Sequence, residues 1–167
     1  MRRFPNLVSR TTTSATTNTG TSLLRDLAAL FKLRLTSLVV FSAGLGYLMG
    51  LPAGTFDGSG LLLMVLAGTL ITGASNAFNQ VWEVETDSLM QRTADRPLVR
   101  GSMSTGLAMV AATVAALAGL VILWSAFGAL TTILGLLSLF LYVALYTPLK
   151  RHSPWAVFVG AFPGAFP

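Results

Sequence analysis

The amino-acid sequence predicts an all-α, polytopic transmembrane helical bundle, and two observations carry this prediction. Hydrophobic residues make up 53% of the chain and charged residues only 10%, with a mean hydropathy of +0.71. This composition is too apolar for a soluble domain of 167 residues. The apolar residues also gather in long runs, most of them close to the roughly 20 residues that a helix needs to cross ~30 Å of hydrocarbon.

Residues 1–22 come first and are predicted to form a disordered tail. They are rich in Thr and Ser, carry three Arg and no acidic residue, and lack apolar periodicity. A mitochondrial transit peptide has a similar composition. Because no amphipathic face bearing Arg is evident, we favour a bacterial tail. The transmembrane domain is expected over residues 23–167.

The apolar runs of that domain predict four complete spans and the start of a fifth. The complete spans cover about 35–51, 61–82, 107–127 and 129–146, and the fifth starts near Trp155. Glycines recur within these runs, as expected where helices pack closely in lipid. The chain has no Cys, which excludes disulfides and thiolate chemistry.

The basic residues predict the orientation of these spans. All eleven Lys and Arg lie before the first span, between spans two and three, or after span four. The opposite connections contain none, so the positive-inside rule places the N-terminus in the cytoplasm. We expect a bacterial inner (plasma) membrane, with the mitochondrial inner membrane as the alternative. The net charge of +5 is explained by this topology and does not indicate nucleic-acid binding.

Four of the six acidic residues lie in one stretch directly after the second span. Within it Asn79, Glu83 and Asp87 are four residues apart, which places them on one helix face in steps of about 6 Å. Carboxylates at a membrane border are costly unless they pair with cations or a metal. Mg²⁺ commonly uses one or two carboxylates together with substrate phosphates, so we predict a Mg²⁺ site formed by these three residues. The alternative is a helix end in a solvated loop. Glu85 faces the other way, towards water.

Cationic residues follow the acidic ones and predict a phosphate-binding site. Arg92 and Arg96 can each grip phosphate oxygens with a guanidinium fork. Tyr146 and Lys150, at the end of the fourth span, lie on the same membrane side. The simpler alternatives are charges that only set topology, and an interfacial Tyr beside a Lys that reaches for water. Together these clusters suggest a diphosphate ester whose lipid tail lies in the bundle.

The motifs N79-x3-E83-x3-D87, R92-T-x2-R96-P and Y146-x3-K150 resemble those of the UbiA superfamily of intramembrane prenyltransferases. Three further features are similar to the protohaem IX farnesyltransferases, the haem O synthase branch of that superfamily: the Asn79-Gln80 pair with Glu83, the stretch LYTPLKRHSPW, and GAFPGAFP at 160–167. The resemblance covers roughly residues 31–167.

This resemblance implies a bundle of about nine membrane helices with a Mg²⁺-bound prenyl diphosphate between two acidic motifs. It implies that Asn79, Glu83 and Asp87 are catalytic and bind the metal. The groups expected to contact the diphosphate are Arg92, Arg96, Tyr146 and Lys150. The implied reaction joins the farnesyl group of farnesyl diphosphate to a vinyl group of haem B. It yields haem O and diphosphate for terminal oxidase assembly, so haem A synthase or oxidase assembly factors are expected partners.

Two departures from the family pattern stand out. Glu83 occupies a position where many superfamily members have Asp, and its longer arm still reaches Mg²⁺. The chain ends at Pro167, before a second acidic motif, so we expect an N-terminal portion that is inactive by itself. Two other functions stay open: another UbiA-type transfer, to 4-hydroxybenzoate or a quinone precursor, and a non-catalytic membrane protein that retains the motif.

Overall fold

A computed structural model describes residues 19–149 and 161, and the segment 19–149 consists of helices and loops without a strand. The elements in chain order are α1 (Thr19–Leu30), α2 (Leu33–Gly50), α3 (Gly58–Ser88), η1 (Gln91–Thr93), α4 (Thr105–Phe140), η2 (Leu141–Tyr146) and α5 (Thr147–Leu149). This confirms the predicted all-α class. Lys150 and the predicted start of a fifth span lie outside the described residues.

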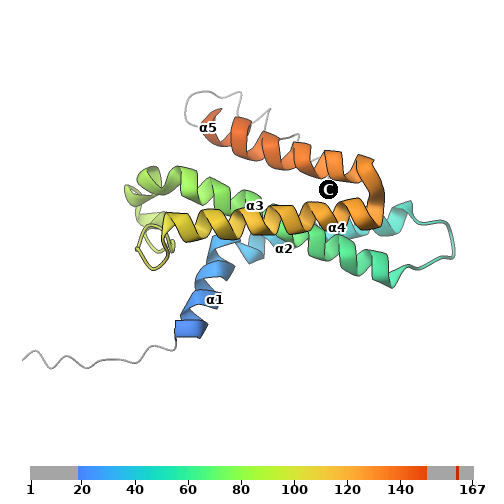
Figure 1. Ribbon diagram of the computed structural model, residues 1–167, viewed down its shortest axis with the longest axis horizontal. Helices are drawn as coiled ribbons and strands as arrows, with labels where there is room; N and C mark the ends of the chain where they lie inside the picture. The colour runs from blue at the N-terminus through green and yellow to red at the C-terminus, as the bar shows by residue number, and fades with distance from the viewer. Residues whose placement is uncertain (1–18, 150–160, 162–167) are drawn as a thin grey trace, which may run out of the picture.

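Within the part of the chain that the structure describes, three segments are long and apolar enough to cross a membrane: Leu33–Gly50, Gly58–Ser88 and Thr105–Leu149. The last contains both of the predicted spans 107–127 and 129–146. They are separated at Gly128, whose φ of 82° favours glycine and lets the chain reverse direction. Figure 1 shows the two arms of this segment running back along each other. The predicted spans 107–127 and 129–146 therefore correspond to separate arms of one segment, joined at Gly128.

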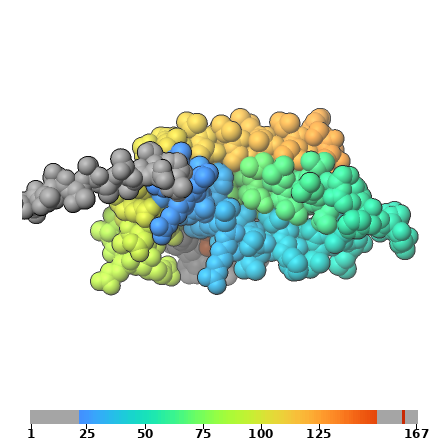
Figure 2. All heavy atoms as spheres, turned by 90° about the horizontal axis from the view of Figure 1, so that it is seen from below, coloured from blue at the N-terminus to red at the C-terminus, as the bar shows by residue number. Residues whose placement is uncertain are grey.

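The central helix is α3, which contacts both α2 and α4. In Figure 2 its green spheres lie between those of α2 and the first arm of α4. Small residues allow the close approach to α4: a Cβ added at Gly119 would lie 2.7 Å from a side-chain carbon of Ile71. Buried alanines of both helices continue this contact towards the C-terminal end of α3, namely Ala74, Ala77, Ala108, Ala112, Ala115 and Ala116. Helix association in lipid depends on such packing, because lipid supplies no hydrophobic drive.

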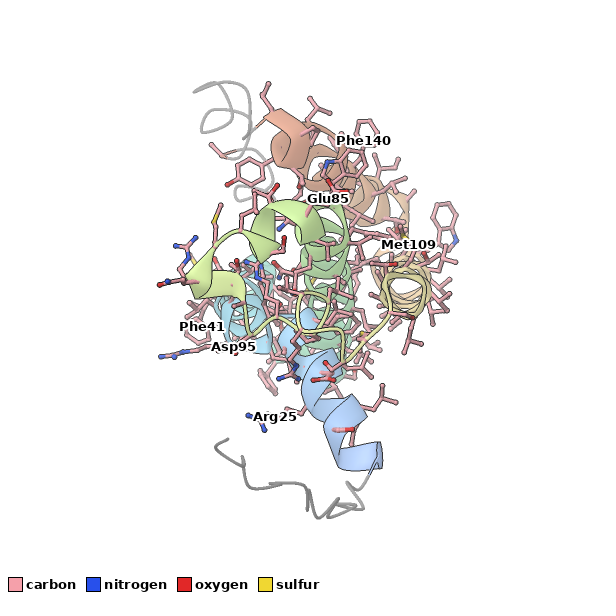
Figure 3. The ribbon with its side chains drawn as sticks, turned by 90° about the vertical axis from the view of Figure 1, so that its left-hand side faces the viewer. Arg25, Phe41, Glu85, Asp95, Met109 and Phe140 are labelled. Atoms are coloured by element: carbon pink, nitrogen blue, oxygen red, sulfur yellow. The ribbon has the colours of Figure 1, made fainter. Side chains whose placement is uncertain are left out.

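Helix α1 begins at Thr19, inside the predicted tail 1–22, and runs across the long axis of the bundle (Figures 1 and 3). An elbow at Lys32, with φ 47° and ψ 52°, joins it to α2. This left-handed conformation is uncommon for residues other than glycine. Helix α1 was not predicted, because its 12 residues do not form the long apolar run that identifies a span.

The two ends of the bundle differ in polarity. One end carries α1, the start of α2, the loop over residues 89–104 and the short α5, whereas the other carries the loop over 51–57 and the Gly128 bend (Figure 1). The basic residues within the described range lie at the first end. The helix α3, at 31 residues, has a length of ~46 Å and exceeds the ~30 Å of hydrocarbon. The polar end of the helix can therefore extend beyond the hydrocarbon.

Candidate functional site

The predicted acidic ladder lies on a buried face at the polar end of α3. Asn79, Glu83 and Asp87 are 3%, 5% and 5% exposed, although they belong to the most polar part of a membrane helix. Glu85 is exposed, as its place on the other face predicts. Figure 3 looks onto this end, with Glu85 on α3 and Asp95 in the following loop. Buried carboxylates need partners, because desolvation of an unpaired charge is costly.

Glu83 is held by an amide. The Nδ2 group of Asn79 donates a hydrogen bond to Oε2 of Glu83 at 2.9 Å. The opposite side of the same amide contacts Thr147, whose hydroxyl lies 3.0 Å from Oδ1 of Asn79 and 2.8 Å from the carbonyl oxygen of Tyr142. Because a hydroxyl has one hydrogen, Thr147 donates to one of these oxygens at a time. Thr147 is fully buried and orients Asn79 from the far arm of the α4 hairpin.

Asp87 has partners for both its side-chain carboxylate and its backbone carbonyl oxygen. Arg96 donates to Oδ2 of Asp87 and forms an ion pair with it. The hydroxyl of Thr93 donates to the carbonyl oxygen of Asp87 at 2.6 Å, and the N–H of Met90 donates to the same oxygen at 3.2 Å, so this acceptor at the end of α3 has two donors. The RTxxRP stretch therefore folds back on the last turn of the helix that carries the carboxylates.

The other predicted diphosphate contacts are placed differently. Arg92 is exposed on η1 and does not join the pair made by Arg96 and Asp87. Tyr146 is half-buried, and its ring lies 5.3 Å from that of Tyr142, tilted by 30°. Both tyrosines belong to η2, a π-helical segment, which is a rare conformation that often accompanies functional sites. Lys150 lies outside the described residues.

Two further polar contacts at this end join α1 to the site, and the sequence analysis missed both. Nε2 of Gln80 donates to the carbonyl oxygens of Ala29 at 3.2 Å and Leu30 at 2.7 Å, and so caps the end of α1. Asp26, which is buried, pairs with Arg100. Nothing local in the sequence indicates these contacts, because the partners are 50 to 74 residues apart.

The oxygen atoms of the ladder fit a small, hard divalent cation. Glu83 and Asp87 supply carboxylates one turn apart, and Oδ1 of Asn79 keeps a second lone pair beyond its contact with Thr147. Within residues 19–149 and 161 no cluster of three or more acidic, His or Cys residues surrounds a metal position. Mg²⁺ tolerates such a sparse set, because it commonly combines one or two carboxylates with water and substrate phosphates.

An apolar cavity of about 330 Å³ lies farther along α3, between α2 and the second arm of α4. Its walls include Ala43, Gly68, Thr72, Leu123 and Gly135. Thr72 precedes Asn79 by seven residues, so the cavity begins about 10 Å along the helix from the ladder. One helix thus carries a polar site at one end and an apolar cavity nearer the other.

A family model and individual relatives both relate this chain to prenyltransferases. The model of the UbiA prenyltransferase family matches residues 38–167. The chain is 45% identical over 150 residues to a protoheme IX farnesyltransferase of Christiangramia forsetii, covering 90% of this chain and 49% of the relative. It is 48% identical over 140 residues to one of Cytophaga hutchinsonii, covering 83% and 48%. The mitochondrial protoheme IX farnesyltransferase of Homo sapiens is 45% identical over 141 residues, covering 84% and 31%.

The chain spans about half the length of the bacterial relatives that it matches and about a third of the human one. No solved structure matched the chain.

Proposed function

The chain belongs to the UbiA prenyltransferase family, and from this membership and the geometry of α3 we propose that it carries the first acidic site of an enzyme that farnesylates haem B. The donor is farnesyl diphosphate, and the products are haem O and diphosphate. The observation that carries the proposal is the buried pair of carboxylates, Glu83 and Asp87, one turn apart on a membrane helix beside Arg96.

Glu83 and Asp87 hold Mg²⁺ in this proposal, with Asn79 as a third oxygen ligand. When bound, Mg²⁺ neutralises negative charge on the departing diphosphate. Glu83 is kept in position by Asn79, which donates a hydrogen bond to Oε2 of Glu83. This hydrogen bond orients the carboxylate towards the proposed metal position.

Arg96 has two roles that follow each other. Without a ligand it balances the charge of Asp87. With a metal at Asp87, Arg96 would be the residue that binds diphosphate oxygens, because its planar guanidinium matches their geometry. Arg92, Tyr146 and Lys150 are proposed to contact the same diphosphate from neighbouring segments. Preorganised cations lower the barrier for breaking the allylic C–O bond, because negative charge develops on the leaving oxygen.

The apolar cavity is the proposed place for the isoprenoid tail. Its volume of about 330 Å³ lies at the lower end of the range for small-molecule pockets, roughly 300–1,000 Å³. Most of the wall is formed by apolar side chains of α2, α3 and α4, with Thr72 and Ser138 among the few hydroxyl-bearing residues. A mainly apolar wall limits the water that would otherwise capture an allylic cation. A donor with its diphosphate at the polar end of α3 would extend its tail along this helix.

The test uses the full-length gene product, purified and reconstituted in nanodiscs. Labelled farnesyl diphosphate is supplied with haem B or with 4-hydroxybenzoate, each with Mg²⁺ and again after removal of the metal by EDTA. We expect labelled haem O only from the first acceptor and only with the metal. Product from 4-hydroxybenzoate would instead assign the protein to another branch of the family. Turnover that survives EDTA would contradict the metal site.

A further inference from the structure

The elbow between α1 and α2 forms an open groove of about 520 Å³ at the polar end of the bundle. Figure 2 shows the face on which these two helices meet, in blue and light blue. The groove is lined by Ala28, Ala29, Lys32, Leu33, Arg34, Leu35 and Leu38. None of these residues belongs to the acidic ladder or to its Arg and Tyr neighbours, so the groove is separate from the proposed catalytic site.

The lining combines two kinds of chemistry. Lys32 and Arg34 bring two cationic side chains, and the described lining contains no acidic residue. Leu35 and Leu38 continue the groove along α2, and their side chains are 49% and 67% exposed. Positive charge at one end and an exposed apolar stripe leading away from it complement a molecule with an anionic head and a hydrocarbon tail.

The groove is also preformed. Gln80 holds the last carbonyl oxygens of α1, and the pair between Asp26 and Arg100 fixes the same helix to the loop after η1. Lys32 itself adopts the left-handed conformation, which is costly for a residue other than glycine and holds the elbow tightly bent. A site whose walls are already in place binds its ligand without an ordering cost.

Position then selects the ligand. Helix α1 runs across the bundle axis (Figure 1), whereas α2 is long and apolar enough to cross a membrane from the elbow onwards. We therefore expect the groove at the border between hydrocarbon and water. We propose that it binds an anionic phospholipid of the surrounding leaflet. The phosphate of the lipid contacts Lys32 and Arg34, and one acyl chain follows Leu35 and Leu38 along α2.

Native mass spectrometry of the full-length gene product in detergent tests this proposal, with dioleoylphosphatidylglycerol and dioleoylphosphatidylcholine as probes. We expect the anionic lipid to be retained in preference to the zwitterionic one. Arg34→Gln and Lys32→Asn should each weaken its binding about fivefold, because each basic residue near an anionic lipid contributes a comparable attraction. Asn is chosen at position 32 because it tolerates the left-handed conformation.

The matched control is Arg25→Gln, which removes the same charge from exposed α1 outside the groove. It should change lipid binding less than twofold. A fourth variant, Ala28→Phe, fills the groove without altering charge and should weaken binding as much as Arg34→Gln does. Equal weakening by Arg25→Gln would show diffuse attraction and overturn the site. So would equal retention of the two lipids, full binding by Ala28→Phe, or equal competition by inorganic phosphate.

Discussion

The two ends of α3 each carry an aspartate, and the surroundings of these residues are opposite. Asp57 precedes the first turn, is exposed, and accepts hydrogen bonds from the N–H of Gly60 at 2.9 Å, the hydroxyl of Ser59 at 2.7 Å and Tyr47 at 2.8 Å. A carboxylate is favoured there, because a helix begins with open N–H donors and a partial positive charge.

Asp87 lies in the last turn, where carbonyl oxygens and the helix dipole disfavour negative charge. It is nevertheless buried, and Glu83 and Glu85 precede it on the same helix. An acidic residue at this position does not stabilise the helix, and its negative charge is balanced by the ion pair with Arg96. From this difference we expect Asp57 to support the fold, and we propose that Asp87 serves the chemistry. Variants of the two residues should then have different effects on stability and turnover.

The largest effect is expected at Asp87. Asp87→Asn should lower turnover of labelled farnesyl diphosphate with haem B by about a hundredfold or more, as loss of a group that stabilises transition-state charge does. Membrane insertion and the unfolding temperature should change little, because the variant also removes a carboxylate from the unfavourable helix end. The matched control is Glu85→Gln, an exposed acid two residues away. An equal loss of turnover in Asp87→Asn and Glu85→Gln would contradict a specific role of Asp87 in the reaction.

A smaller loss is expected at Thr147, which orients the polar end from another helix. Thr147→Val keeps the side-chain shape and removes the hydroxyl, so Asn79 loses a buried partner. We expect turnover to fall ~10–100-fold, as for other groups that orient metal ligands, and the Mg²⁺ concentration for half-maximal activity to rise. Thr147→Ser should restore both. An unchanged Mg²⁺ requirement in the Val variant would reduce Thr147 to a packing role.

The apolar cavity beside the half of α3 nearer Asp57 should affect which donor is used, with less effect on the chemistry. Ala43→Phe narrows the apolar cavity and should shift preference from farnesyl towards the shorter geranyl diphosphate by about tenfold, the scale on which apolar pockets discriminate small differences in hydrocarbon length. Competition between the two labelled donors measures this ratio. Ser42→Phe places the same ring on an exposed neighbouring position and serves as control. An unchanged ratio in the Ala43 variant would place the tail elsewhere.

The smallest effect is expected at Asp57, and it concerns stability alone. Hydrogen bonds from the Gly60 N–H, Ser59 and Tyr47 lower the pKa of Asp57 from 3.8 to about 2. Its contribution to folding is therefore complete above pH 3.8 and is lost as the pH falls towards 2. Asp57→Ala should lower the unfolding temperature slightly at neutral pH, flatten its decline over this acidic range and leave turnover unchanged. A strong loss of turnover would contradict the contrast with Asp87.

Much of the transmembrane frame could be predicted from local pattern. The four complete apolar runs largely coincide with helices of the structure. In lipid each helix must form its backbone hydrogen bonds within itself, so its position is encoded in its own residues. The four-residue spacing of Asn79, Glu83 and Asp87 placed them on one face for the same reason. The orientation in the membrane and the roles of these three residues stay predictions.

Only the tertiary structure decided the partners of these residues. Thr147 meets Asn79 across 68 residues, and Arg100 meets Asp26 across 74. The bend at Gly128 and the elbow at Lys32 bring these pairs together. Helical periodicity specifies which face a side chain occupies within its own helix, whereas the neighbour across that face depends on how separate helices pack. The sequence by itself therefore determined the long apolar helices and the polar ladder, whereas the packing of the helices determined which residues hold the ladder in place.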